Sequence, residues 1–217
     1  MDTVNDKTII TALHRLVDHY GHQNWWEHDN KIADWVAMIL IQQTTEQNAN
    51  RALDNLAPYL SVDQLREMSL EALQTHIQPA GFYKQKSNYI KALMNWFHAH
   101  GRSLDKFDHY STTELRKELL TIKGVGDETA DAMLLYIFNR KVFIADQYAM
   151  RLFDRLGFGH FNKYAVMRAA FNHLVKDISL KQCKEWHAAI DVHGKAFRKN
   201  KQLDETWLIT PTVATEE

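Results

Sequence analysis

The chain has 217 residues, of which 45% are hydrophobic, and a formal net charge of −1 at pH 7. This length can bury a sizeable core in one or two domains, and the hydrophobic content excludes an intrinsically disordered protein. Eight glycines and three prolines are too few for the many turns of a sandwich or barrel. Basic residues gather late in the chain, which suits either a nucleic-acid contact or an ordinary solvated helix face: Lys181, Lys184, Lys195, Arg198, Lys199 and Lys201.

The first residues, MDTVNDK, contain no basic region followed by an apolar run, and no stretch is long enough to span a membrane. The single cysteine, Cys183, excludes an internal disulfide and a multi-cysteine metal site within one chain. We therefore expect a soluble, cytoplasmic protein.

Apolar residues recur at helical spacing almost throughout the chain. They predict helices over residues 6–20, 28–42, 45–57, 61–67, 70–77, 84–100, 112–121, 127–138, 147–157, 162–177 and 180–197. Ser111 and Glu114 have the spacing of a capping box, and Gly101 and Gly157 stand where C-terminal caps are expected. The strand-like run 142–145 is too short to found a sheet, so the predicted fold class is all-α.

The stretch IKGVGDETADAML, residues 122–134, places two glycines around a valine between two amphipathic helical patterns. Two antiparallel helices with so short a link need a tight turn, and glycine adopts the positive φ angles that the turn requires. The backbone N–H groups of Gly124, Val125 and Gly126 would then be uncovered at the positive end of the next helix. That arrangement suits a phosphate, bound directly or through a monovalent cation, and equally a hairpin without a ligand.

The same stretch carries a resemblance to a known family. LLTIKGVGDETADAMLLY followed by VFIADQYAMRLFDRLG resembles the helix-hairpin-helix signature of the endonuclease III superfamily of DNA glycosylases. Three more segments match in family order, MILIQQTTEQNANRALDNL, IQPAGFYKQKSNYI and WHAAIDVHGKAF, so the resemblance covers roughly residues 25 to 200. It implies a two-lobed helical fold with an interlobe cleft. Residues 23–137 would form a six-helix lobe with the hairpin, and residues 1–22 with 138–217 the second lobe.

The resemblance implies that Asp146, twenty residues after Gly126, is the catalytic group. Cleavage of an N-glycosidic bond passes through a sugar with oxocarbenium character, which an ionised carboxylate stabilises while it orients or deprotonates water. Asp146 also stands at the N-cap position of a helical pattern, so the alternative is a purely structural cap.

Two departures from the family narrow the chemistry. Bifunctional members carry a lysine at the position of Glu128, where the amine forms a Schiff base and allows strand cleavage. A carboxylate cannot do so, and Lys123 lies across the glycine turn, which predicts a monofunctional enzyme that uses water. Glu128 can also be an ordinary N-terminal helix acid. Many members close with four cysteines that hold a [4Fe–4S] cluster, whereas HGKAFRKNKQLDETWL has none, so we expect no cluster and no metal site.

The remaining site residues follow from the same resemblance. The predicted DNA contacts are Gln43, at the wedge position, and the hairpin residues Lys123, Gly124, Val125, Gly126 and Thr129; a solvent-facing glutamine is the alternative for Gln43. The predicted base pocket consists of Trp25, Trp26, Glu46, Glu128 and Lys201. The two tryptophans offer flat surfaces for an extruded base, although a tryptophan pair is more often part of a core. Glu46 replaces an expected aromatic residue.

Without the lysine and the cluster, and with the tryptophan pair, the chain is most similar to the 3-methyladenine branch of the superfamily. We expect a monomeric DNA glycosylase of base excision repair that flips an alkylated purine, such as 3-methyladenine, out of double-stranded DNA. A positively charged base would stack strongly on aromatic faces. Two alternatives stay open: a non-catalytic helix-hairpin-helix DNA-binding protein, and a bifunctional glycosylase with abasic-site lyase activity.

Overall fold

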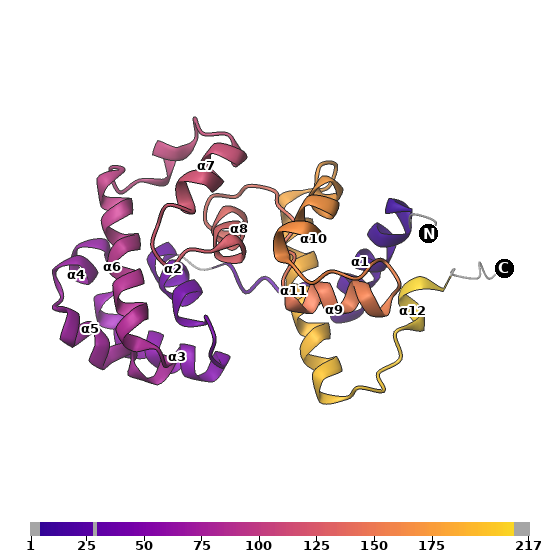
Figure 1. The fold of residues 1–217 in the computed structure, drawn as a ribbon, viewed down its shortest axis with the longest axis horizontal. Coiled ribbons are helices and arrows are strands. Elements are labelled where there is room, and N and C mark those ends of the chain that lie inside the picture. Colours follow the sequence, from indigo (N-terminus) through magenta and orange to yellow (C-terminus); the bar gives the residue numbers. More distant parts are fainter. Residues whose placement is uncertain (1–4, 28–29, 211–217) are drawn as a thin grey trace. The chain divides into compact units, whose positions relative to one another are not determined.

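The computed structural model describes residues 5–27 and 30–210, and within these ranges it contains helices and no β-strand, as predicted (Figure 1). The α-helices are α1 (Asp6–Tyr20), α2 (Lys31–Leu40), α3 (Glu46–Leu56), α4 (Val62–Glu67), α5 (Leu70–Ile77), α6 (Tyr83–Ala99), α7 (Thr112–Leu119), α8 (Asp127–Tyr136), α9 (Gln147–Arg155), α10 (Tyr164–Phe171), α11 (Leu180–Lys199) and α12 (Thr206–Ile209). Short 3₁₀ helices cover Ala57–Tyr59, Gln78–Ala80, Leu104–Phe107 and Asn172–Val175. In this part of the chain, no helix has the length and apolar character needed to cross a bilayer.

The chain divides into two compact units. The central unit is the continuous segment Trp26–Arg140, and the terminal unit combines the residues up to Trp25 with those from Lys141 onward. The terminal unit is therefore assembled from both ends of the chain.

The central unit is built around α2 and α6. Helix α2 packs against α3, α6 and α8, while α6 also covers α4 and α5. Trp35 on α2 is fully buried, and its ring meets the Phe97 ring edge-on, with centroids 4.5 Å apart. Burial of such large rings supplies most of the stabilising free energy in a core of this kind.

The terminal unit is built around α11, which packs against α1 and α9. Helix α1 is amphipathic and buries Ile9, Leu13 and Leu16. Its Arg15 guanidinium donates hydrogen bonds to the carbonyl oxygens of Trp207, Leu208 and Thr210, which joins α1 to α12. The first described helix and the last are thus held together by side-chain and backbone contacts.

Most helix ends follow local signals, and Ser111 and Glu114 form the predicted capping box. Helix α2 begins at Lys31 after the N-cap Asn30, so the predicted start at residue 28 lies outside the described residues. The single helix predicted over 162–177 is wrong, because α10 ends at Phe171. The chain continues from there as the 3₁₀ helix Asn172–Val175, and the Asn172 side chain accepts a hydrogen bond from the Phe143 N–H at 3.0 Å.

Candidate functional site

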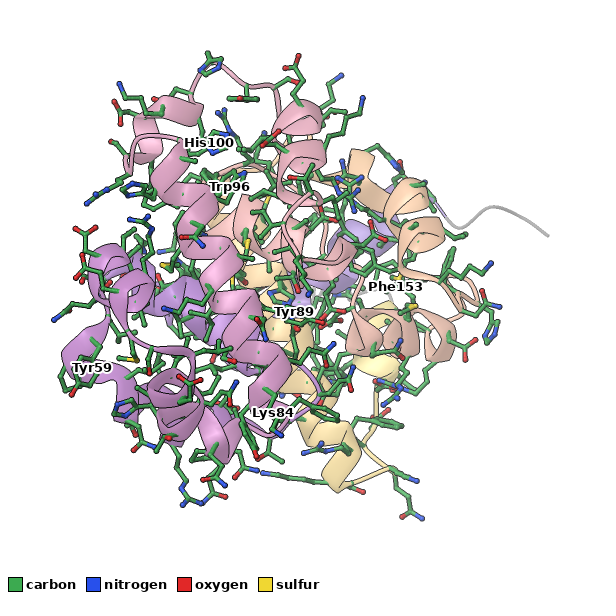
Figure 2. All side chains as sticks on the ribbon, turned by 60° about the vertical axis from the view of Figure 1, so that its left-hand side comes forward. Tyr59, Lys84, Tyr89, Trp96, His100 and Phe153 are labelled. Carbon is green, nitrogen blue, oxygen red and sulfur yellow. The ribbon has the colours of Figure 1, made fainter. Side chains whose placement is uncertain are left out.

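The glycine turn between α7 and α8 lies in the central unit. Gly124 has a φ of +92°, and a Cβ at this position would lie 2.1 Å from Cγ of Tyr89, so only glycine fits. Tyr89 projects from the middle of α6 (Figure 2). Gly126 is the N-cap of α8 in extended conformation, with open space around its Cα.

One predicted feature of the turn is wrong. The Val125 N–H donates to the carbonyl oxygen of Ile122 at 3.0 Å, and the Val125 side chain is buried. This N–H is therefore used inside the turn and is not available to a ligand. Among the described residues, no acceptor is recorded for the N–H of Gly124 or Gly126, so these two donors remain candidates for a phosphate or a cation-linked contact. The Lys123 side chain is exposed beside them.

A residue to which sequence reasoning gave no role connects this turn to a second one. Gln42 Nε2 donates to the Gly124 carbonyl oxygen at 3.0 Å and to Thr129 Oγ1 at 3.2 Å. Gln42 precedes Gln43, which is exposed and has a φ of +52° in the turn between α2 and α3. The turn between α2 and α3, which carries Gln43 and is called the wedge turn below, is thus hydrogen-bonded to the hairpin. The adjacent glutamines were visible in the sequence, but the contact across 82 positions was not.

Lys86 stabilises the end of α2, directly before the turn that carries Gln43. Its side chain is only 2% exposed, and Nζ donates to the carbonyl oxygens of Leu40 at 2.7 Å and Ala80 at 2.9 Å. Burial lowers the pKa of this ammonium to about 8. Because Leu40 is the last residue of α2, Lys86 satisfies a C-terminal helix carbonyl directly before the turn that carries Gln43.

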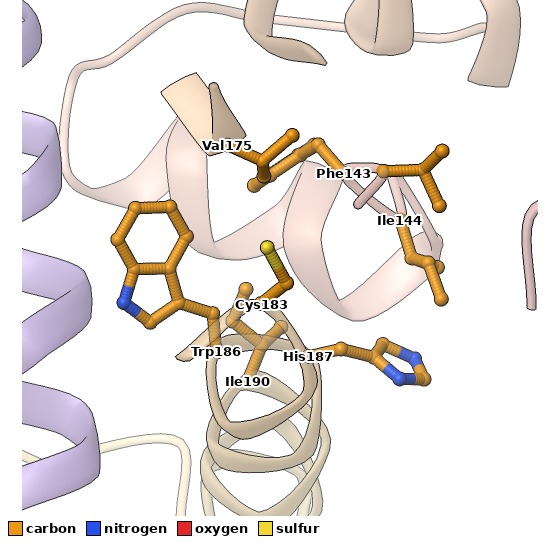
Figure 3. Close-up of a pocket in the computed structure, with 8 residues that line it drawn as sticks. Phe143, Ile144, Val175, Cys183, Trp186, His187 and Ile190 are labelled. Carbon is orange, nitrogen blue, oxygen red and sulfur yellow. The ribbon is translucent and has the colours of Figure 1, made fainter. Parts of the chain in front are cut away.

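Asp146 is the N-cap of α9 in the terminal unit, as the sequence predicts. Oδ1 accepts a hydrogen bond from the Ala149 N–H at 2.7 Å, and the residue is 9% exposed. Oδ2 lies 3.7 Å from Nε2 of His187 on α11, beyond hydrogen-bond range but close enough for an ion pair when the imidazole is protonated. Figure 3 shows His187 beside Ile144, the second residue before Asp146. Nothing in the sequence pattern singled out His187.

The tryptophan pair has two different environments. Trp25 is 45% exposed, and its ring stands edge-on to the His187 ring with centroids 6.4 Å apart in the terminal unit. Trp26 is 7% exposed and packs against Tyr136 of the central unit. Trp26 is therefore a core residue, as the alternative interpretation of the pair has it, and Trp25 is the one that presents a surface for stacking.

The other predicted pocket residues are divided between the two units. Glu46 and Glu128 are exposed in the first turns of α3 and α8, both in the central unit. Lys201 is exposed beyond the end of α11 in the terminal unit, where it lines a hollow with Tyr148 and Arg198.

The residues present do not fit an iron–sulfur cluster. Cys183 is the single cysteine of the chain, and it is buried on α11 against Val142 and Trp186. Burial raises the pKa of its thiol to about 11, which opposes metal binding by the thiolate. One thiol cannot replace four, and no group of three or more His, Cys, Asp or Glu side chains in the described ranges could hold a metal ion.

Comparison with known proteins places this geometry in context. Residues 36–177 match the family described as HhH-GPD superfamily base excision DNA repair protein. The putative DNA repair glycosylase MJ1434 of Methanocaldococcus jannaschii is 37% identical over 195 residues, which cover 87% of each chain. Endonuclease III of Sulfolobus acidocaldarius is 28% identical over 177 residues, which cover 80% of this chain and 76% of that protein.

Solved structures share the fold. The 3-methyladenine DNA glycosylase MagIII of H. pylori, bound to 1,N6-ethenoadenine, superposes with a TM-score of 0.74 at 24% identity and covers 93% of this chain and 100% of that one. A non-covalent endonuclease III–DNA complex gives a TM-score of 0.73 at 20% identity, with 95% of each chain covered.

Proposed function

Since this chain belongs to the HhH-GPD superfamily and is a DNA glycosylase of base excision repair, we propose that it is a monofunctional enzyme for alkylated purines. In this proposal it binds double-stranded DNA as a monomer, flips a base such as 3-methyladenine out of the duplex, and hydrolyses the N-glycosidic bond with Asp146. Flipping takes the base out of the stack, where its glycosidic bond can be reached.

The observation that carries the proposal is the setting of Asp146. The hydrogen bond from the Ala149 N–H to Oδ1 restrains the carboxylate, and Oδ2 lies 3.7 Å from His187 Nε2. An oriented carboxylate in a largely water-excluded position stabilises a developing oxocarbenium ion more strongly than one in solvent. The same carboxylate can orient or deprotonate the water that attacks C1′.

The absence of lyase activity rests on Glu128. Helix α8 begins directly after the hairpin, and its first turn carries Asp127 and Glu128 instead of an amine. A Schiff base with C1′ needs a primary amine as nucleophile. The nearby amine, Lys123, precedes the Gly124 turn and is not part of α8.

The choice of an alkylated purine rests on Trp25. An exposed indole next to an imidazole offers a face on which an extruded base can stack, and alkylation gives the base a positive charge that strengthens the contact. The similar fold of a protein named 3-methyladenine DNA glycosylase supports this choice.

The hairpin and wedge contacts of this proposal lie in the central unit. The Gly124 and Gly126 N–H groups and Lys123 would bind the backbone, directly or through a monovalent cation, which positions the strand without reading its sequence. Gln43 would enter the duplex as the wedge. The hydrogen bonds of Gln42 to Gly124 and Thr129 would keep the wedge turn and the hairpin in register.

The test is a base-release assay on methylated duplex DNA with the wild type and Asp146→Asn. We expect the wild type to free 3-methyladenine and leave abasic sites that break only after alkali. Loss of one well-placed electrostatic contact should slow Asp146→Asn by about a hundredfold to a thousandfold, or ~3–4 kcal/mol. Asparagine is as good an N-cap as aspartate, so α9 should stay folded and circular dichroism should be unchanged.

Three results would contradict parts of the proposal. Strand breaks before alkali treatment would show a bifunctional enzyme. DNA binding by both proteins without release of any base, on methylated DNA and on mismatched, deaminated and oxidised bases, would indicate a non-catalytic DNA-binding protein. Release of a different base would keep the enzyme and overturn the alkylpurine substrate.

A further inference from the structure

A basic hollow of about 170 Å³ opens between α9 and the C-terminal end of α11, within the terminal unit. A cavity needs roughly 10–15 Å³ to hold a single water molecule, so the hollow has room for a much larger group. Four cationic side chains line it: Arg151, Arg155, Arg198 and Lys201. The rings of Tyr148 and Phe197 supply an apolar floor. By contrast, the hollow around Cys183 measures about 10 Å³ and holds at most one water.

The charge of the hollow is not balanced by the protein. Arg155 is paired, because Glu205 accepts hydrogen bonds from its Nε and Nη2 at 2.7 Å each. Arg151, Arg198 and Lys201 are exposed, and no carboxylate in the described ranges forms an ion pair with them. No acidic side chain lines the hollow. Three like charges around one space repel each other unless an anion enters it.

The helices place these cations by their spacing. Arg151 and Arg155 are one turn apart on α9, so their side chains project from one face of that helix. On α11, Arg198 lies one turn after Gly194. A Cβ on Gly194 would lie 2.2 Å from the Tyr148 ring, so the ring rests directly on the backbone of α11. A larger residue at position 194 would displace the Tyr148 ring.

We propose that the basic hollow binds one phosphate of the DNA substrate. Guanidinium groups match phosphate oxygens with paired N–H donors, and a lysine ammonium adds a point charge. The inference rests on the proposed function, since it takes the ligand to be DNA. It assigns Lys201 to the phosphate rather than to the base pocket. Because Tyr148 and Arg151 belong to the helix that Asp146 caps, a phosphate held here fixes the strand relative to the carboxylate.

The test is the salt dependence of binding to an undamaged, fluorescently labelled duplex, measured by anisotropy over a range of KCl concentrations. We compare the wild type with Arg198→Gln, with Arg151→Gln/Arg198→Gln, and with Lys199→Gln as matched control. Lys199 lies next to Arg198 in the last turn of α11 and is also exposed, but it does not line the hollow. The two single variants therefore lose the same charge at neighbouring positions.

If the hollow binds one phosphate, the slope of log K against log salt, which is negative, should become less steep by about 0.9 in the double variant. Arg198→Gln should produce part of this change, and Lys199→Gln should keep the wild-type slope. Arg198→Lys keeps the positive charge and should therefore retain most of the wild-type slope. Equal slopes for the double variant and the Lys199→Gln control, with all proteins folded by circular dichroism, would overturn the inference.

A second arm separates DNA from a free anion. Inorganic phosphate is added to the wild type and the double variant, and the melting temperatures are compared. If phosphate stabilises only the wild type while the DNA slopes are equal, the hollow binds free phosphate and the DNA assignment is wrong. Base release from methylated DNA is measured in the same samples. Release with equal slopes overturns the phosphate site alone, whereas changed slopes without release overturn the proposed substrate alone.

Discussion

His187 is the basic side chain next to Asp146, with Nε2 3.7 Å from Oδ2 and its ring edge-on to Trp25. All three residues belong to the terminal unit, where α11, which carries His187, packs against α9, the helix that Asp146 caps. An imidazole in this place can hold the carboxylate, or a water beside it, in the orientation that attack on C1′ requires. In the proposed mechanism His187 would act through Asp146, as a positioning residue.

At this scale we predict that His187→Gln lowers kcat for base release by about tenfold to a hundredfold, the cost of a misplaced reacting group. KM and the affinity for undamaged duplex should stay near the wild-type values, because no phosphate contact is lost. Kinetic assays of base release measure kcat and KM, and fluorescence anisotropy measures the affinity for undamaged duplex. His160→Gln is the control, since His160 is an exposed imidazole of the same unit that pairs with Asp154. An unchanged kcat for His187→Gln would remove His187 from the site.

At the scale of elements, the glycine turn between α7 and α8 shows that two neighbouring glycines have different reasons to be there. Gly124 is required for its φ of +92° and its contact with Tyr89. Gly126 has an ordinary extended backbone and open surroundings at the N-cap of α8. Serine is favoured at such an N-cap position, because its hydroxyl accepts a hydrogen bond from a backbone N–H in the first turn of the helix.

The same substitution at the two positions should therefore have opposite outcomes. Gly124→Ser should lower the free energy of unfolding by about 1–3 kcal/mol, because a side chain in the left-handed region is strained, and should weaken DNA binding. Gly126→Ser should be neutral or slightly stabilising. Urea denaturation and anisotropy measure the two effects. Equal stability of the two variants would mean that the turn relaxes around the added hydroxymethyl group and that Tyr89 does not confine it.

Helix positions were largely predictable because periodicity, caps and glycines act over a few residues. Asn5, Ser61, Ser69, Ser111, Asp146 and Ser179 all cap the helices that follow them. The prediction was wrong at Asn172, where the α-helix gives way to a 3₁₀ helix and the side chain accepts a hydrogen bond from the distant Phe143 N–H. Helix α12 has four residues, too few for a periodic pattern, and it is held by Arg15 of α1.

On the scale of the whole molecule, a polar network joins the two ends of the chain in the terminal unit. Tyr20 of α1 hydrogen-bonds to His193 Nδ1 at 2.9 Å, and His193 Nε2 lies 2.6 Å from Glu205. Glu205 also pairs with Arg155 of α9. The side chain of Glu205 is only 12% exposed, so removal of one partner would leave a poorly solvated charge.

This network makes stability depend on pH. Burial by itself raises the pKa of the Glu205 carboxyl, but hydrogen bonds from Arg155 and His193 outweigh it and lower the pKa from 4.5 to about 2. A depressed pKa stabilises the folded state above the unfolded value of 4.5, and this contribution is lost as the pH falls toward 2. A shift of this size corresponds to on the order of 3 kcal/mol.

We therefore expect Glu205→Gln to be less stable than the wild type at pH 7, and the difference to shrink as the pH falls below 4.5. Urea denaturation between pH 7 and 3 measures it. Asp177→Asn, which removes an exposed carboxylate of the same unit, should keep the wild-type pH profile. A constant difference between Glu205→Gln and wild type at every pH would show that the network does not titrate as stated.

The sequence by itself determined the features that depend on neighbouring residues or on residue type. These are the all-α fold class, the helix caps including Asp146, the glycine turn, and the exclusion of a four-cysteine cluster by one cysteine. Only the tertiary structure decided which tryptophan is exposed, that Gln42 reaches Gly124, that His187 stands beside Asp146, and that Arg151, Arg198 and Lys201 surround one hollow. Each of these depends on contacts between helices far apart in the chain, and periodicity carries no information about such contacts.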